Sequence, residues 1–408
     1  MLLQISLIVI LLVWLVAMIA AYQWGNIGRL LTHRDSVLAQ PSAELPPLSV
    51  VICTHNHASA LKRHLPAILE QDYDKFEVII VDSSSEDETK DVLERLEFKY
   101  SNLRHTFTPA SARDISIECL AIMLGFRAAS HEWVVLTRPD CEPQSQQWLL
   151  RIGETIASPK SSVQSPCLKQ PEMVIGLSRF DTQRSTWLST QTSFHRLCHL
   201  VSLSQHILDG HAAVTADRCN LAVHKSYFME HGGFEEAQHL RASAVELLVN
   251  HTSTPTNTAL MLVPSAMMLQ DPLSSHQQWK KQRVFYAEAQ HHQRHTALFR
   301  FKQFWRQITP WVTLLLVLPW LASIALTAAQ VELGLGIPAA VVMLVLTLLL
   351  LILIVTKVTQ FNITARALGY PKYYISLFLL EPRLLLWELS ARFTRRLASP
   401  NEFRKKFV

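Results

Sequence analysis

Side chains with the chemistry to bind phosphate or metal ions stand just beyond two apolar runs of the sequence. Asp82 ends the run FEVIIVD, and Asp140 follows the run EWVVL, with Arg138 two residues before it. A pair of carboxylates at such a strand end would hold a metal ion and a nucleotide diphosphate. Arg138 stands in the second position, where a guanidinium can bind a diphosphate bidentately and replace the charge of the metal. Asp140 therefore has two open interpretations, a lone ligand for Mg²⁺ or Mn²⁺ and a loop residue paired with Arg138.

An α/β sheet is needed to bring these residues together. Apolar runs of strand length alternate with runs of helical periodicity, which is typical of β-α-β units in a parallel sheet. The expected strands are 48–54, 76–82 and 132–137, and the expected helices are 58–71, 85–96 and 114–130. Ligands bind beyond the carboxyl ends of such strands. Thr54, Asn56, Asp82, Arg138 and Asp140 are thus expected around one crevice, although Asp82 alternatively caps the next helix.

Long uncharged segments predict membrane spans. Hydrophobic residues make up 49% of the 408 residues and charged residues only 17%, which is lean for a fully soluble protein. Segments 2–22, 307–331 and 333–356 each exceed the roughly 20 residues that cross a bilayer. The first lacks the basic start and the cleavage site of a signal peptide, so we expect an uncleaved anchor. The expected parts are an anchor at 1–24, a linker at 25–46, a large domain at 47–306, spans at 307–331 and 333–356, and a basic tail at 357–408.

The distribution of lysine and arginine predicts the orientation. Residues 280–306 hold seven of these residues and 357–408 hold ten, whereas the turn between the second and third spans holds none. Positive charge stays on the cytoplasmic side, so we expect the large domain and the tail in the cytoplasm and the N-terminus outside. Segment 373–397 is apolar but interrupted by charge, which indicates an amphipathic helix lying on the bilayer.

Several other functions are disfavoured by composition. The six cysteines are scattered, with no C-x-x-C pair, which indicates free thiols rather than disulfides or a zinc site. The chain has only 11 glycines and no Gly-rich phosphate loop, which argues against a P-loop or Rossmann dinucleotide site. No basic stripe alternates with aromatic residues, so nucleic acid is not an expected partner.

The order of the motifs resembles glycosyltransferase family 2. The stretches that carry the resemblance are SVVICTHN, AIMLGFRAASHEWVVLTRPDCEP and DRCNLAVHKSYFMEHGGF, and the match covers residues 48–290. The resemblance implies a GT-A fold, an α/β domain with a mixed, mostly parallel sheet, accompanied by transmembrane helices. It also implies an inverting sugar transfer from a nucleotide-sugar donor, with a D-x-D motif holding a divalent metal and a later acidic pair supplying the base.

The sequence departs from the family at each of these motifs. The D-x-D position reads RPD, and the acidic pair falls on Ala244 and Val245, which leaves Glu246 as the candidate catalytic base. A one-residue shift turns a helical side chain by about 100°, so Glu246 is expected to point away from the family's position.

Because Arg138 replaces one carboxylate of the D-x-D position, Mg²⁺ or Mn²⁺ is expected to be needed weakly or not at all.

Four residues are candidates for the acceptor side. The resemblance places Asn220 in the family's Asn-Leu-Ala strand, and Gln282 and Tyr286 at a Q-x-x-R-W motif whose arginine is Phe285 here. Trp279 and Tyr286 have two open interpretations, stacking on a sugar and membership of an aromatic belt at the membrane surface.

Two functions from different classes remain open. The first is a multi-pass glycosyltransferase of the bacterial inner (cytoplasmic) membrane, acting in surface polysaccharide or glycolipid synthesis. Its partners would be a nucleotide-sugar donor, a lipid or glycan acceptor and the lipid bilayer. The second is a catalytically inactive homologue that serves as scaffold or regulator of another glycosyltransferase, since the departures fall at the active-site motifs while the core strands look intact.

Overall fold

The computed structural model describes residues 2–32, 44–108, 116–157, 171–181, 186–234, 244–294, 296–329, 332–333 and 337–397. Contacts divide the chain into two compact units. Unit 1 comprises Met1–His33 and Ala297–Leu389, and unit 2 comprises Arg34–Thr296 and Ser390–Val408. Half of the expected linker, residues 33–43, and the end of the expected tail lie outside the described residues.

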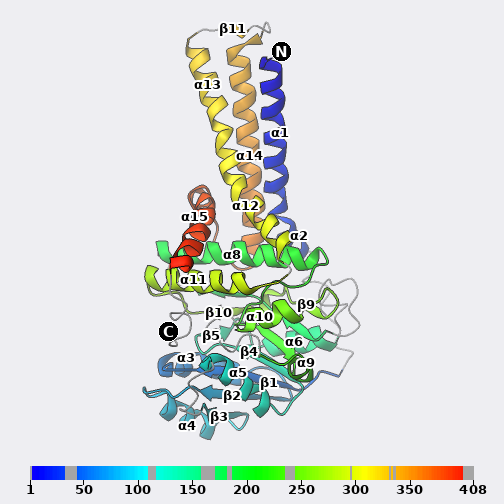
Figure 1. The fold of residues 1–408 in the computed structure, drawn as a ribbon, viewed down its shortest axis with the longest axis vertical. Helices are drawn as coiled ribbons and strands as arrows, with labels where there is room; N and C mark the ends of the chain where they lie inside the picture. The colour runs from blue at the N-terminus through cyan, green and yellow to red at the C-terminus, as the bar shows by residue number, and fades with distance from the viewer. Residues whose placement is uncertain are drawn as a thin grey trace. The chain divides into compact units, whose positions relative to one another are not determined.

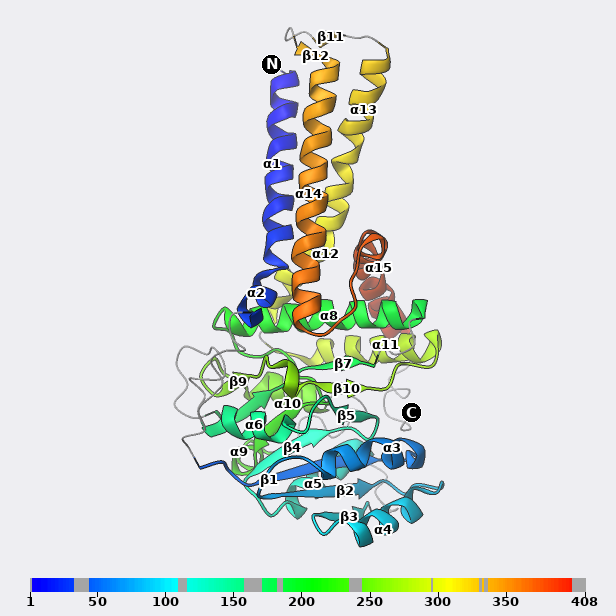
Figure 2. The ribbon, with the colours of Figure 1, turned by 180° about the vertical axis from the view of Figure 1, so that it is seen from behind.

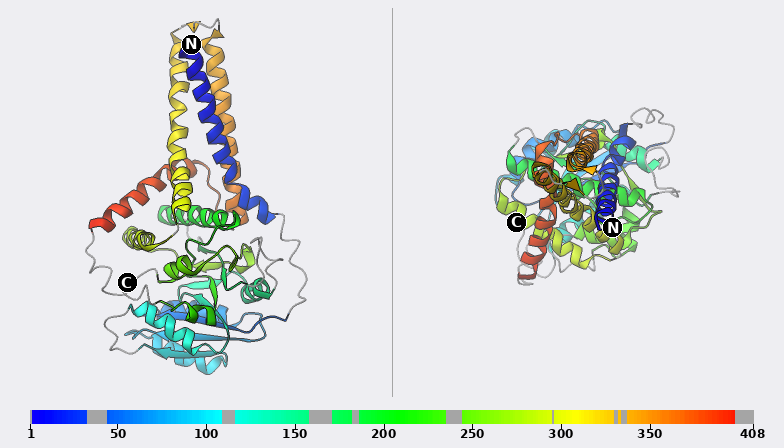
Figure 3. Two further views of the ribbon diagram at one scale, coloured as in Figure 1. Left: turned by 45° about the vertical axis from the view of Figure 1, so that its right-hand side comes forward. Right: turned by 90° about the horizontal axis from the view of Figure 1, so that it is seen from above.

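Unit 1 is helical. Its helices are α1 (Leu2–Gln23), α2 (Asn26–Thr32), α12 (Ala297–Leu315), α13 (Val317–Ala328), α14 (Ala339–Ala367) and most of α15 (Ile375–Leu397), with the paired strands β11 (Glu332–Leu333) and β12 (Ile337–Pro338). Three stretches, Ile8–Leu31, Ala297–Ala328 and Ala340–Ala367, are long and apolar enough to cross a membrane. Figures 1 and 3 show α1, α13 and α14 side by side as a bundle.

Small residues pack two helices of unit 1 together, and an ion pair joins α14 to α15. Ala17 and Ala21 of α1 pack against Leu353 of α14, and such small side chains let two helices approach closely within a membrane. Farther along α14, Lys357 lies 2.5 Å from Glu381 of α15, and both side chains are almost fully buried. The buried charges of Lys357 and Glu381 therefore compensate each other.

Unit 2 is an α/β domain. Its strands are β1 (Leu48–Thr54), β2 (Phe76–Asp82), β3 (Leu103–Phe107), β4 (Trp133–Thr137), β5 (Cys141–Pro143), β6 (Met173–Ile175), β7 (Ser178–Phe180), β8 (Leu221–His224), β9 (Thr258–Leu260) and β10 (Met268–Gln270). Its helices are α3 (Ala58–Leu69), α4 (Thr89–Lys99), α5 (Ile117–Ala128), α6 (Trp148–Ala157), α8 (Trp187–Leu208), α9 (Lys225–Glu230), α10 (Ala244–Thr252) and α11 (His276–His292), with a 3₁₀ turn η2 (Pro264–Ala266).

The strands form a mixed, mostly parallel sheet. Seven strands lie in the order β3-β2-β1-β4-β8-β6-β9, and only β8 runs antiparallel to its neighbours. A second sheet has the order β5-β10-β7. Figure 2 shows α3, α4 and α5 around the parallel part of the first sheet. The carboxyl ends of β1, β2 and β4 meet at one edge, because these strands are parallel neighbours.

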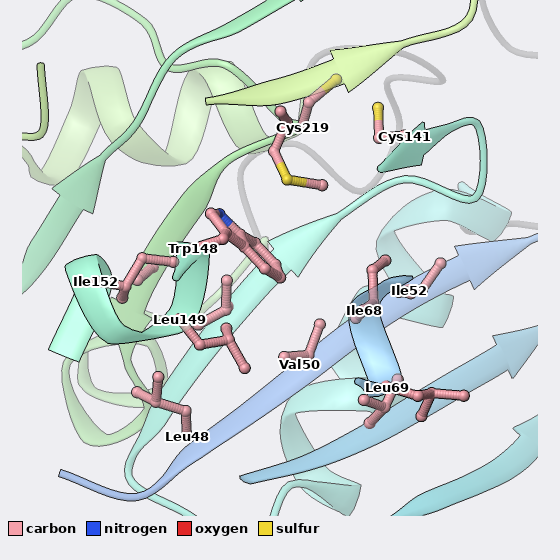
Figure 4. Close-up of a cluster of buried hydrophobic side chains, with 14 of the residues drawn as sticks. Leu48, Val50, Ile52, Ile68, Leu69, Cys141, Trp148, Leu149, Ile152 and Cys219 are labelled. Atoms are coloured by element: carbon pink, nitrogen blue, oxygen red, sulfur yellow. The ribbon is translucent and has the colours of Figure 1, made fainter. Parts of the chain in front are cut away.

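A continuous core lies between the sheet and its helices. Val50 of β1 is fully buried, and Trp148 of α6 is the largest fully buried side chain. Figure 4 shows Trp148 in the same cluster as Val50, with Cys141 and Cys219 nearby. On the other face of β1, a Cβ added at Gly125 of α5 would lie 2.3 Å from Val51 Cγ1. Helices thus cover both faces, which explains why the central strands are apolar throughout.

The structure corrects three expectations about these elements. β3 is missing from the prediction, because LRHTF is an edge strand that buries only Leu103. The sequence MVIGLSRF at 173–180 is typical of a single strand, but it forms two strands in different sheets, separated at Gly176, which lies against the buried side chain of Asn220. The helix expected from residue 85 begins at Thr89, because Ser85 donates its hydroxyl to Asp82 at 2.5 Å instead of capping a helix.

Candidate active site

Arg138 and Asp140 form a closed pair beyond the end of β4. Arg138 Nε and Nη2 donate to Asp140 Oδ1 and Oδ2 at 2.8 and 3.1 Å, which is a bidentate fork. Gln270, the last residue of β10, donates its Nε2 to Asp140 Oδ2 at 2.9 Å. The fork that the sequence suggested for a diphosphate is thus made to Asp140 in this structure.

This pairing decides how well the site suits a divalent metal. Burial by itself raises the pKa of Asp140, but the charge of Arg138 and the hydrogen bonds from Arg138 and Gln270 outweigh it and hold the pKa well below its usual range. Both carboxylate oxygens are already bonded, and the described residues contain no cluster of three His, Cys, Asp or Glu side chains suited to a metal. Mg²⁺ and Mn²⁺ prefer several oxygen ligands, so the residues present do not fit such an ion.

The ends of β1 and β2 organise a polar loop. Thr54 and Asp82 are register partners on the two strands. Asp82 accepts from the Ser85 hydroxyl and backbone N–H, which agrees with a turn-forming role. Asn56 adopts a left-handed backbone with φ of 55° and accepts from Glu86 N–H at 2.8 Å. Thr54 Oγ1 is buried without a hydrogen-bond partner among the described residues.

A second charged cluster joins α5, α10 and the segment before β8. Arg218 donates Nη1 to Glu118, and its Nε lies 3.5 Å from Glu246 Oε1. Glu246 is 3% exposed, and within the described ranges its Oε2 has no hydrogen-bond partner. The preceding residues Ala244 and Val245 are buried and apolar. Glu246 therefore faces a guanidinium rather than solvent, in spite of its shifted position on the helix.

Electrostatics link Arg218 to Glu246 on one side and to Arg138 on the other. Burial raises the pKa of Glu246, the Arg218 charge lowers it and the Glu118 charge raises it, and the net shift is upward. The pKa of Arg218 is raised chiefly by Glu118, while the positive charge of Arg138 opposes that rise. Arg138 and Arg218 are thus within electrostatic reach of each other. A buried carboxyl that lies beside a guanidinium can accept a proton from a substrate as a general base.

The candidate aromatic residues of α11 have different surroundings. Tyr286 lies within electrostatic reach of Glu246 and Arg218, and its hydroxyl accepts from Gln282 Nε2 at 3.4 Å. Trp279 is 5% exposed, and the guanidinium of Arg283 lies 4.4 Å from its ring centre. Tyr286 is therefore placed beside the charged cluster, whereas one face of Trp279 is covered by the protein itself.

Asn220 acts as an internal brace. Its Oδ1 accepts from Trp148 Nε1 at 3.0 Å, and its Nδ2 donates to the carbonyls of Leu177 and Ala266 at 3.0 and 2.8 Å. The residue is 1% exposed. These bonds use the whole amide group and indicate a structural role for the Asn220 side chain.

Three residues of the site were missed by sequence reasoning. Gln270, Arg218 and Glu118 stand next to strand or helix ends, which is the only signal that the sequence carries for them. Gln270 reaches Asp140 because β10 pairs with β5, in the register Gln270 to Cys141. Pairings between such distant segments are not visible in local periodicity.

Comparison with known proteins places this geometry in context. Residues 49–199 match the family model described as Glycosyl transferase family 2. Glycosyltransferase AglE of Haloferax volcanii is 30% identical over 118 residues, which are 28% of this chain. The match spans 37% of that relative's own length.

Solved structures show the fold. The mannosyltransferase PcManGT from Pyrobaculum calidifontis, in complex with GDP-Man and Mn²⁺, has a TM-score of 0.51 at 16% identity, covering 94% of this chain and 99% of that one. S. aureus TarS in complex with UDP-GlcNAc has a TM-score of 0.40 at 12% identity, covering 86% and 90%. The first likeness identifies the α/β unit as a GT-A fold.

Proposed function

We propose that the protein, whose residues 49–199 match the glycosyltransferase family 2 model and whose α/β unit has the GT-A fold, transfers a sugar from a nucleotide-sugar to an acceptor at a membrane face. The three helices that are long and apolar enough to cross a membrane support the location. The acceptor is a lipid or glycan of surface polysaccharide or glycolipid synthesis. The membrane is the bacterial inner membrane, with the domain in the cytoplasm.

The buried carboxyl of Glu246 is the observation that carries this proposal. It has an unpartnered oxygen, a raised pKa and a guanidinium at 3.5 Å. The acceptor hydroxyl gives its proton to Glu246 Oε2 while its oxygen bonds to the anomeric carbon of the sugar. The bond from that carbon to the diphosphate oxygen breaks, and the nucleoside diphosphate leaves with the electron pair.

Other residues bind and orient the substrates. Thr54 and Asp82 lie at adjacent strand ends, where the nucleoside of the donor binds. Tyr286 lies beside Glu246 and offers an aromatic face to the acceptor sugar. Any requirement for Mg²⁺ or Mn²⁺ is weak, because Arg138 occupies the oxygens of Asp140.

One observation favours a second candidate function, that of a non-catalytic partner of an active transferase. Ala244 and Val245 are apolar and buried, so Glu246 is the only carboxyl among residues 244–246. If Glu246 does not act as a base, the domain retains the fold without the chemistry.

A transfer assay separates the two functions. The full-length protein in detergent is incubated with labelled GDP-mannose or UDP-GlcNAc and bacterial lipid extract, and lipid-bound label is measured. Catalysis predicts transfer that falls by about 10²–10⁴-fold in Glu246→Gln, the typical contribution of a positioned base. The control Glu94→Gln changes an exposed residue of α4 and should retain full activity. Transfer that is equal in the two variants would rule out Glu246 as the base. Absence of transfer, together with loss of a neighbouring transferase's activity on deletion of this protein, would favour the non-catalytic function.

A further inference from the structure

Two half-buried guanidinium groups keep unused donors at the proposed donor site. Arg138 gives Nε and Nη2 to Asp140, and its Nη1 makes no hydrogen bond within the described part of the chain. Arg218 donates Nη1 to Glu118, and its Nε lies near Glu246. Its Nη2 likewise makes no hydrogen bond to the described residues. The side chains are 33% and 23% exposed, so these donors are accessible to a ligand.

The sheet sets the two groups close together. Arg138 directly follows the end of β4, and Arg218 stands three residues before β8, the antiparallel neighbour of β4. Thr137 Oγ1 donates to the carbonyl of Cys219 at 2.8 Å, which joins the two segments at this edge. Two guanidinium groups held in this way can donate hydrogen bonds to one anion that lies between them.

Each guanidinium also has a carboxylate that fixes its orientation. The pairs Arg138 with Asp140 and Arg218 with Glu118 are neutral before a ligand arrives, so the guanidinium groups are positioned without a large local charge. A guanidinium has five N–H donors and can therefore keep its carboxylate while donating to phosphate. A divalent metal at Asp140 would have to displace the fork from Arg138 first.

We propose that Arg138 and Arg218 form a metal-independent clamp for the diphosphate of the donor, one guanidinium on each side of the phosphate oxygens. This inference rests on the proposed function and deepens it, because it assigns the hydrogen bonds that hold the leaving group to two arginines of the chain. The clamp binds pyrophosphate as well as a nucleoside diphosphate, since neither the base nor the sugar takes part.

Calorimetric titration of the full-length protein in detergent with EDTA tests the clamp. Pyrophosphate, UDP and GDP are each titrated, first without metal and then with Mn²⁺. We expect pyrophosphate and at least one nucleoside diphosphate to bind in EDTA. Arg138→Gln and Arg218→Gln should each weaken that binding by about tenfold or more, the loss of charged hydrogen bonds. Arg95→Gln, on the exposed surface of α4, is the matched control and should bind normally.

Two further variants guard against a folding defect in Arg218→Gln. Arg218→Lys keeps the charge without the planar fork and should bind more weakly than the native protein. Glu118→Gln releases Nη1 of Arg218 and should bind pyrophosphate more tightly than the native protein. A residue that only braces Glu118 would leave pyrophosphate binding unchanged in both.

The outcomes distinguish the clamp from the proposed function. Binding of nucleoside diphosphate only with Mn²⁺, or binding in EDTA that is unaffected in the Arg218 variants, overturns the clamp and leaves the donor site standing. Absence of binding by all three probes, with and without metal, overturns both.

Discussion

Glu118 and Glu246 share one guanidinium, so the charge of the first influences the protonation of the second. The negative charge of Glu118 raises the pKa of Glu246, and Arg218 lowers it. A base must be ionised to accept a proton, so the transfer rate should rise with pH through the raised pKa of Glu246.

Glu118→Gln should move this rise to lower pH. The substitution removes a charge that raises the pKa of Glu246 and leaves Arg218 to interact with Glu246 alone. The measurement is kcat/KM for transfer between about pH 5 and 9, with Glu94→Gln as the control. An unchanged profile in an active Glu118→Gln protein would contradict the assignment of Glu246 as the base.

The ion pair of Asp140 should stabilise the folded protein at neutral pH and lose this effect in acid. Its folded pKa lies below the unfolded value, which is about 3.9. The contribution to stability is therefore fully present above the unfolded pKa and is lost as pH falls through the folded pKa.

Asp140→Asn should destabilise unit 2 by about 1–3 kcal/mol at pH 7. The difference in Tm between this variant and the native protein should become smaller below about pH 4. A gap that stays constant down to pH 3 would argue against the ion pair.

The candidate residues that the sequence identified are those that directly follow an apolar strand. Arg138, Asp140 and Asp82 directly follow apolar strands, so their place in the fold follows from the strands. The hydrogen-bond partners of these residues could not be predicted from the sequence. Gln270 lies 130 residues beyond Asp140, and only the pairing of two short strands brings them together.

At the scale of elements, buried strands were predictable and edge strands were not. β1, β2 and β4 are continuous apolar runs because helices cover both faces. β3 pairs on one side only and needs little apolar surface. The division between β6 and β7 depends on a glycine whose neighbour is distant in sequence.

Gly176→Ala should test how closely the backbone between β6 and β7 packs against Asn220. The new Cβ would lie 2.3–2.6 Å from side-chain atoms of Asn220, which is fixed by three hydrogen bonds. We expect a loss of about 1–3 kcal/mol in the free energy of unfolding, the usual cost of overpacking, measured by urea denaturation.

A double variant supplies the control for that measurement. Asn220→Ser shortens the side chain that the Cβ would meet, so its cost and that of Gly176→Ala should combine to less than their sum. Strict additivity would show that the two residues do not interact.

At the scale of the whole molecule, the apolar segments were predictable because a span must be long and uncharged. The second stretch is the instructive difference, since its helix begins at Ala297 rather than at residue 307. Its first turns carry Arg300, Lys302 and Arg306, which a search for uncharged runs leaves out. Helix formation tolerates these charges, whereas the hydrocarbon core does not.

The topology makes a prediction of its own. Reporter fusions after residues 40 and 408 should be cytoplasmic, and one at residue 332 should lie outside, because lysine and arginine flank the spans on one side only. Enzymatic reporters that are active on opposite sides of the membrane provide the measurement. A signal from outside at residue 408 would contradict the assignment and require a further crossing.

The cysteines give the molecule a low background in thiol labelling. Cys119, Cys141, Cys198 and Cys219 are buried and Cys53 is half-buried. Burial, reinforced by the nearby Glu118 charge, raises the pKa of the Cys53 thiol, and burial raises that of Cys119 to about 12. Only the thiolate reacts with alkylating reagents. Cys167 lies outside the described residues and would be replaced by serine. A single cysteine introduced on either side of the membrane should then show by its reaction with an impermeant maleimide whether it is exposed. The native thiols of the folded protein should not react.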